Sequence, residues 1–196
     1  MKRAAFRVAV SGVPLEKLVF LDECGFSLNL MRLYGWTVGG GRCCEPVPFN
    51  RGQNRSVVGA FSLPTSASAS PACNGMWALW HKAGAMKRED FEFFLREHLL
   101  PVLEPGSVLV LDNARIHHGG QIEALVEQAG CSLLYLPPYS PDFSPIELAW
   151  SWIKNHVRTR APREDAARQQ AIQDAAHALP AQAAPAWFKH CAYGLT

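Results

Sequence analysis

The sequence predicts an α/β fold in which a mixed five-stranded sheet is flanked by helices. Five short apolar runs have the length of buried strands, and three other stretches carry apolar residues at helical spacing. The first three apolar runs follow one another directly, whereas helical stretches separate the later ones. Consecutive strands favour antiparallel pairing and strands joined through helices favour parallel pairing, so a mixed sheet is expected.

The first half of the chain supplies three consecutive strands, which suggest an antiparallel meander. They are residues 18–21, which end on Asp22, followed by residues 56–61 and 76–81. Glycines and prolines between residues 24 and 55 are turn signals and predict one long inserted loop. A Ser-, Ala- and Pro-rich stretch, residues 64–71, predicts an exposed hairpin tip.

In the second half, helices and strands alternate. Phe91, Phe94, Leu95 and Leu99 recur at helical spacing and predict the first helix. The elements expected after it are a strand at 108–111 ending on Asp112, a helix at 121–128, a strand at 132–136 and a helix from about 145 to 157. Three strands, helix, strand, helix, strand, helix is the order of a ribonuclease-H-like fold.

Length and composition suit one compact domain. The chain has 196 residues, 48% of them hydrophobic, and such a length removes roughly 70% of the unfolded surface from water. We interpret residues 1–17 as a lead-in, residues 18–160 as the ribonuclease-H-like domain and residues 161–196 as a helical tail. The net charge is only +2, so any contact with nucleic acid must come from local patches.

Other features of the composition bear on the cellular compartment. The six cysteines form no C-x-x-C pair and have no zinc-like spacing with the histidines, which is typical of reduced thiols in a cytosolic protein. Charges interrupt the apolar residues at the start too early for a signal peptide, and no stretch approaches the ~20 apolar residues of a membrane span. We expect a soluble, cytoplasmic protein that does not interact with membranes.

Two aspartates, Asp22 and Asp112, each follow a buried apolar strand. If these strands are neighbours, both carboxylates emerge at the same edge of the sheet, where they repel each other unless a cation lies between them. Oxygen ligands suit magnesium or manganese, so the pair is a candidate metal site. The alternative interpretation is that each aspartate only starts a turn at a strand end.

Glu147 is the third acidic candidate. Ser144 and Pro145 precede it, so a capping box at the start of the last helix is a strong alternative to metal binding. Lys154 and Arg158 fall on the same helix face as Glu147, and cations beside a carboxylate suit an ion site next to a DNA backbone. Ordinary solvated charges are the competing interpretation of both.

Several nearby residues carry less weight. His117 follows Asp112 closely enough to approach a phosphate, although a local hydrogen bond is equally plausible, and we assign it to DNA binding as an auxiliary residue. Glu23 should point to the opposite side of the strand from Asp22, and Asp142 suits a turn. Trp150 and the other tryptophans are interpreted as core residues.

Three segments together resemble a known family. LVFLDECGF, VLVLDNARIHH and LPPYSPDFSPIELAWSWIK are similar to the three acidic motifs of DDE transposases of the mariner-like and insertion-sequence 630 group. The 34 residues between Asp112 and Glu147 are the spacing typical of that group. The resemblance runs from about Leu18 to Val157.

This resemblance implies a function and a mechanism. Asp22, Asp112 and Glu147 would be the catalytic triad and would bind two divalent ions, Mg²⁺ or Mn²⁺, roughly 3.5–4 Å apart. Water would cleave a strand at the transposon end, and the freed 3′ hydroxyl would then attack target DNA. The loop at residues 24–55 occupies the position at which mariner-like enzymes contact a partner subunit, so a homodimer involving Arg51 and Arg55 is expected.

The chain departs from the family near its start. Asp22 leaves no room for an N-terminal helix-turn-helix DNA-binding domain, so we expect either a separately encoded helix-turn-helix partner or a truncated copy with little activity. Two alternatives to a transposase stay open from the residues alone. One is another ribonuclease-H-like nuclease, and the other is an inactive remnant.

Overall fold

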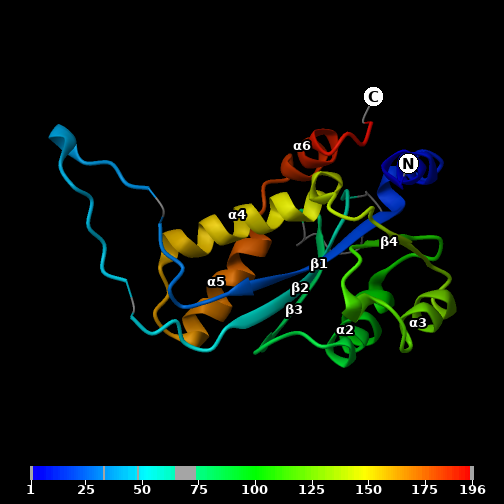
Figure 1. The fold of residues 1–196 in the computed structure, drawn as a ribbon, viewed down its shortest axis with the longest axis horizontal. Coiled ribbons are helices and arrows are strands. Elements are labelled where there is room, and N and C mark those ends of the chain that lie inside the picture. Colours follow the sequence, from blue (N-terminus) through cyan, green and yellow to red (C-terminus); the bar gives the residue numbers. More distant parts are fainter. Residues whose placement is uncertain (1, 33, 48, 65–73, 195–196) are drawn as a thin grey trace.

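The computed structural model describes residues 2–32, 34–47, 49–64 and 74–194. Its centre is a five-stranded sheet in the order β3-β2-β1-β4-β5 (Figure 1). The first three strands pair antiparallel, and β1, β4 and β5 pair parallel. The predicted mixed sheet and the ribonuclease-H-like order of elements are confirmed. The strands are β1 (Leu18–Phe26), β2 (Arg55–Phe61), β3 (Met76–Ala83), β4 (Val108–Leu111) and β5 (Ser132–Tyr135).

Helices cover both faces of the sheet. The α-helices are α1 (Lys2–Ser11), α2 (Arg88–Phe94), α3 (Ile122–Gln128), α4 (Pro145–Arg160), α5 (Asp165–His177) and α6 (Ala183–His190). A π-helical turn at Leu95–Leu99 and a 3₁₀ turn at Leu100–Val102 continue α2. No element was expected where α1 lies, and the helical tail expected at residues 161–196 consists of α5 and α6. No helix within the described ranges is both long and apolar enough to cross a membrane.

The core has two layers, one on each face of the sheet. Side chains of α1, α4, α5 and α6 pack on one face, and those of α2 and α3 pack on the other (Figure 1). Residues alternate between the layers along β1, because successive side chains of a strand point to opposite faces. Leu18 and Phe20 belong to the α4 layer, whereas Val19 and Leu21 belong to the α2 layer.

Strand β1 is longer than expected. The sequence analysis ended it at Asp22, but it continues to Phe26. Its parallel pairing with β4 is recorded from Leu18 to Phe20, while its antiparallel pairing with β2 continues to Phe26 opposite Arg55. Strand β2 therefore continues to pair with the β1 backbone beyond Asp22, and β1 extends past the end of β4.

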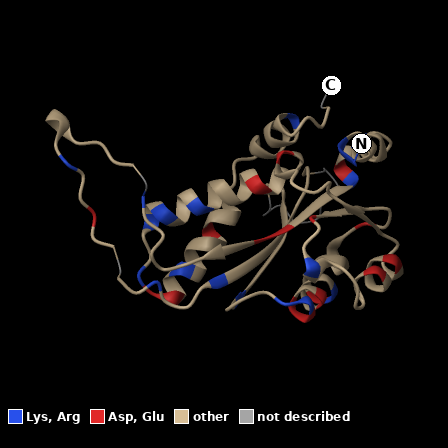
Figure 2. Cartoon of the chain, viewed as in Figure 1, with Lys and Arg blue, Asp and Glu red and all other residues tan. Residues whose placement is uncertain are grey.

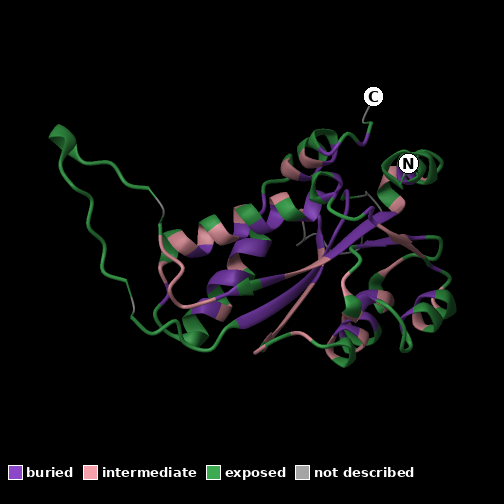
Figure 3. Ribbon diagram, in the orientation of Figure 1, coloured by how far each residue is buried: buried purple, intermediate pink, exposed green. Residues whose placement is uncertain are grey.

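The described residues between 27 and 54 form a long arm that projects away from the sheet (Figure 1). Most of its described residues are exposed (Figure 3). Tyr34, Trp36 and Phe49 are 88%, 99% and 105% exposed, so the arm presents large apolar side chains to solvent. The predicted hairpin tip falls almost wholly on residues 65–71, which lie outside the described residues.

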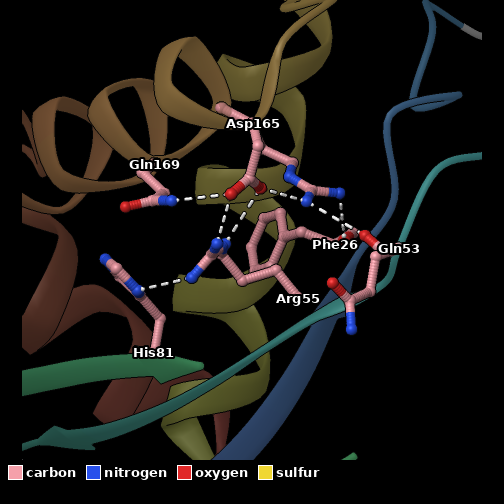
Figure 4. A network of polar contacts seen from close by, with 7 residues as sticks. Phe26, Gln53, Arg55, His81, Asp165 and Gln169 are labelled. Carbon is pink, nitrogen blue, oxygen red and sulfur yellow. Dashed lines mark hydrogen bonds and ion pairs between the residues drawn. The ribbon is translucent and has the colours of Figure 1, made fainter. Parts of the chain in front are cut away.

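An ion network of two buried arginines and the exposed Asp165 fastens the base of the arm to helix α5 (Figure 4). Arg168, only 2% exposed, donates to the backbone carbonyls of Phe26 and Gln53 at 3.0 Å each and pairs with Asp165. Arg55 also binds Asp165, with its Nε 3.1 Å from the carboxylate. The two ends of the arm are therefore held by one helix, and Arg55 is a buried structural residue unsuited to the subunit contact expected of it.

Candidate active site

The three acidic candidates line one cavity of about 480 Å³. Asp22 comes from β1, Asp112 follows β4, and Glu147 lies in the first turn of α4. Phe20 on β1 pairs with Val110 on the parallel strand β4. Asp22 and Asp112 each lie two residues further along, so they are level with each other. The expectation that neighbouring strands bring these two aspartates to one edge agrees with this geometry.

Asp22 is the most buried of the three carboxylates and has a strongly altered pKa. Burial, together with the negative charges of Glu147, Glu23 and Asp112, raises its pKa to about 8. Its Oδ2 accepts a hydrogen bond of 3.1 Å from the indole Nε1 of Trp150. Trp150 therefore belongs to the core, as expected, and also contacts the site.

Gly59 on β2 makes room for the Trp150 ring. A Cβ atom at this position would lie 2.9 Å from the edge of the indole, closer than ordinary contact allows. Gly59 also pairs with Asp22 across the two strands. Helix α4 can therefore approach the sheet closely enough for the indole to reach Asp22.

Asp112 is held by donors that follow it in the chain. Its Oδ1 lies 2.8 Å from the backbone nitrogen of Ala114 and 2.7 Å from Nδ1 of His117. The hydrogen bond from His117, opposed by partial burial, lowers the pKa of Asp112. Since its side chain is 52% exposed, the carboxylate remains open toward the cavity.

His117 lies behind the site. Its side chain is fully buried, with Nε2 2.9 Å from Glu23 Oε1 and its ring centroid 4.6 Å from that of Phe91. Burial alone would lower its pKa, but the hydrogen bonds and charges of Asp112 and Glu23 raise it to about 10. A buried imidazolium between two carboxylates offers no surface to DNA, so the DNA-binding role assigned to His117 does not suit this geometry.

Glu23 explains where the His117 side chain is directed. It lies on the face of β1 opposite Asp22, as expected from strand alternation, and its carboxylate binds His117. The 3₁₀ turn at Arg115–His117 folds back beneath the end of β4 and brings the imidazole there. Glu23 was set aside at first because it should point away from Asp22, and its partner, 94 residues away, gave no local signal of this role.

Glu147 does not act as a helix cap. Ser144 is the N-cap residue but makes no side-chain capping hydrogen bond, and the backbone nitrogen of Glu147 donates to the Ser144 carbonyl at 3.1 Å. Within the described residues, no hydrogen bond involves the Glu147 carboxylate, and the side chain is exposed. The capping-box interpretation therefore loses its geometric basis, and the carboxylate is available in the cavity.

Lys154 and Arg158 lie farther along α4, and basic residues follow this helix toward the base of the arm (Figure 2). Both side chains are partly exposed. Arg158 donates to Asn155 at 2.8 Å, and Lys154 lies close enough to the Cys24 thiol to oppose the rise in its pKa that burial causes. Neither residue forms an ion pair within the described part of the chain, so both charges remain available to an anionic ligand.

A divalent cation suits the chemistry of the donors. All three acids offer carboxylate oxygens, and the pKa of Asp22 is raised by burial and by the negative charge of its acidic neighbours, which a cation would neutralise. Among the described residues, however, no three His, Cys, Asp or Glu side chains stand close enough together to form a ready-made ion site. The three acids therefore share a cavity without forming a ready-made ion site.

Comparison with known proteins identifies both a family and a fold. A family model described as DDE superfamily endonuclease matches residues 17–168. No sequence among the curated proteins matches the chain. The chain thus shares a sequence family with DDE endonucleases over most of its length.

Solved structures similar to this chain include the Mos1 transposase paired-end complex with left transposon end, at 14% identity and a TM-score of 0.71. That match and the Mos1 mariner paired-end complex with Mn each cover 97% of this chain and 57% of the other. The catalytic domain of Mos1 mariner transposase matches at 10% identity and a TM-score of 0.61, covering 97% of this chain and 85% of that domain. At such low identity these similarities show the fold, and the chain spans little more than half of the longer transposase chains.

Proposed function

Because this chain belongs to the DDE superfamily of endonucleases, we propose that residues 18–160 are the catalytic domain of a DNA transposase. This domain cleaves phosphodiesters at transposon ends and transfers the 3′ hydroxyl to target DNA. One observation carries the proposal: Asp22, Asp112 and Glu147, from three separate elements, line a single cavity.

The same three carboxylates would hold two divalent cations, Mg²⁺ or Mn²⁺. When bound, such ions activate the attacking oxygen and stabilise the leaving oxygen of an in-line displacement. The chain prepares for this by holding one oxygen of each aspartate, Asp22 Oδ2 by Trp150 and Asp112 Oδ1 by Ala114 and His117. A structure of the Mos1 mariner paired-end complex is described with Mn and another with Mg, which supports this choice of ions.

The chemistry consists of two displacements at phosphorus. Water is the nucleophile of the first, and the 3′ hydroxyl freed by that cleavage is the nucleophile of the second. Neither step needs a covalent intermediate on the protein. The role of the chain is to hold the reacting groups at the edge of a rigid sheet, where positioning contributes strongly to the rate.

We assign Lys154 and Arg158 to contacts with the DNA backbone. Both lie on the helix that carries Glu147, and neither pairs with a carboxylate within the described residues. Basic residues lie along α4 toward the arm (Figure 2). A phosphate backbone that follows α4 would therefore meet cations next to the acidic cavity.

We propose further that the arm, residues 27–54, joins two copies of the chain. Several large apolar side chains of the arm are exposed together, and such a grouping indicates a surface that a partner covers. They are Tyr34, Trp36, Val38, Val47 and Phe49. Arg51 is exposed and remains a candidate contact, whereas Arg55 is occupied by Asp165. Light scattering with and without DNA should show a dimer that is weakened in Trp36→Ser. If the Trp36→Ser variant has the same mass as the parent, the arm does not join the two copies.

The test of function is a cleavage and strand-joining assay with Mn²⁺ or Mg²⁺ on the DNA ends that flank the gene. The chain is compared with Asp112→Asn, each with and without a helix-turn-helix partner that would recognise those ends. Joined products that the substitution abolishes support a transposase. Cleavage without joining would indicate a different ribonuclease-H-like nuclease, and folded protein that never cleaves would indicate an inactive remnant.

A further inference from the structure

The turn between β5 and α4 contains a tyrosine that is fully exposed and has an unusual backbone conformation. Tyr139 is 100% exposed, and its backbone φ of 54° lies in the left-handed region. Bulky residues seldom adopt that conformation, which glycine or asparagine adopts more readily. Strained, exposed residues that a fold retains cluster at ligand-binding and catalytic sites. Within the described residues, the phenol makes no hydrogen bond that would explain it as structural.

The turn itself is braced, so Tyr139 stands on a fixed support. Arg3 from α1 donates to Ser140 Oγ at 2.8 Å and pairs with the Asp142 carboxylate. The Phe6 ring stacks on Phe143 with centroids 5.6 Å apart. At the other end of the chain, Tyr193 Oη donates to the Phe143 carbonyl at 2.7 Å.

Tyr139 also lines the cavity that contains Asp22, Asp112 and Glu147. Those carboxylates attract cations and repel a bare phosphate, and among the described residues they alone set the charge of the cavity. The uncharged Tyr139 ring must therefore contribute something other than charge. What the ring adds is a flat apolar face beside the place where a phosphodiester would react. The ligand chemistry that matches such a face is a nucleobase, since every base has a π surface.

We propose that Tyr139 stacks on a base of the DNA strand whose phosphate is cut at the three carboxylates. This inference rests on the proposed function and adds to it a subsite for a nucleobase. The stacked base fixes the strand beside the cavity without reading its sequence. Loss of one base–aromatic stack weakens binding by about 5- to 150-fold.

The substitution that tests this is Tyr139→Asn. Asparagine removes the ring but favours the left-handed backbone, so the variant should fold at least as well as the parent. Tyr139→Phe keeps the ring and removes only the hydroxyl. Phe93→Ser is the control for losing an aromatic ring outside the cavity; Phe93 lies on α2, is 42% exposed and packs against Trp80 and His98.

The probe is a transposon-end duplex with 2-aminopurine at successive positions around the cleaved phosphate. We expect the parent and Tyr139→Phe to quench the fluorescence at one position. Tyr139→Asn should lose that quenching, bind DNA about 5- to 150-fold more weakly and cleave more slowly at subsaturating DNA. Phe93→Ser should behave as the parent, and melting temperatures would verify folding.

Two outcomes overturn the inference, and they are distinguishable. If the parent cleaves DNA and Tyr139→Asn matches it in quenching and affinity, the nucleobase subsite is wrong while the proposed function stands. If the parent neither binds nor cleaves the duplex, with or without the helix-turn-helix partner, the proposed function fails and the subsite fails with it.

Discussion

Replacing His117 by leucine tests whether a buried imidazolium holds two carboxylates in place. His117 is fully buried, Glu23 is 17% exposed, and the two side chains meet at 2.9 Å. In His117→Leu the Glu23 carboxylate stays largely buried without its cation, and such a loss costs about 3–5 kcal/mol. The Asp112 side chain is 52% exposed, so water can replace the hydrogen bond it loses from His117. The loss at Asp112 therefore adds about 1 kcal/mol or less. We expect the free energy of unfolding to fall by about 3–5 kcal/mol.

Urea unfolding, followed by tryptophan fluorescence, measures this change within a double-mutant cycle. Glu23→Leu and the double variant complete the cycle, and coupled neighbours show interaction energies of about 0.5–3 kcal/mol. The double variant should therefore be less destabilised than the sum of the two single changes. His118→Leu is the control, since His118 is exposed and should change stability by about 0.5 kcal/mol or less. Simple additivity of His117→Leu and Glu23→Leu would refute the buried ion pair.

Three further predictions concern other contacts. Trp150→Phe removes the indole N–H that donates to Asp22. Because a hydrogen bond to a charged group is worth about 1.5–3 kcal/mol, metal-dependent cleavage should slow about 10- to 100-fold. The control Trp152→Phe, on the same helix, should cleave at the parent rate. Equal rates would show that the indole contact is dispensable. Arg168→Met leaves two backbone carbonyls without their charged donor and should lower the free energy of unfolding by about 2–4 kcal/mol in urea, a loss that an unchanged midpoint would contradict. The hydrogen bonds from Arg55 and Arg168 lower the pKa of Asp165, so the stability that Asp165 contributes is complete above the unfolded pKa of ~3.9 and is lost as the pH falls below that value. Asp165→Asn should therefore flatten the fall in the free energy of unfolding at acid pH. Parallel pH profiles of the parent and the variant would contradict this prediction.

The order of elements was predictable because it depends on local pattern. Five apolar runs and their spacing were enough to indicate a mixed sheet that becomes parallel in its second half. The structure supplies the pairing of β1 with β4, which the sequence left as a condition. The juxtaposition of Asp22 and Asp112 followed from the same reasoning, since each ends or follows an apolar run on neighbouring strands. Glu147 was identified by its motif and spacing, and the structure removed its competing role as a cap.

The errors share one cause, which is pairing between distant residues. Ending β1 at Asp22 ignored β2, whose pairing carries the strand on to Phe26. His117 was assigned to DNA because it follows Asp112 closely, with a local hydrogen bond as the alternative. The local bond to Asp112 is the one present, while Glu23, 94 residues away, gave no local signal. Arg55 was assigned to a subunit contact, whereas Asp165, 110 residues later, binds it.

The sequence alone therefore determined the fold class, the edge of the sheet at which the acids gather and the family to which the chain belongs. Only the tertiary structure decided which side chains hold those acids, which charges are already paired and that Tyr139 stands exposed at the cavity. The physical reason is that hydrophobic periodicity acts over a few residues and is written locally in the chain. Hydrogen bonds and ion pairs act over about 3 Å in space and can join residues at any separation in sequence.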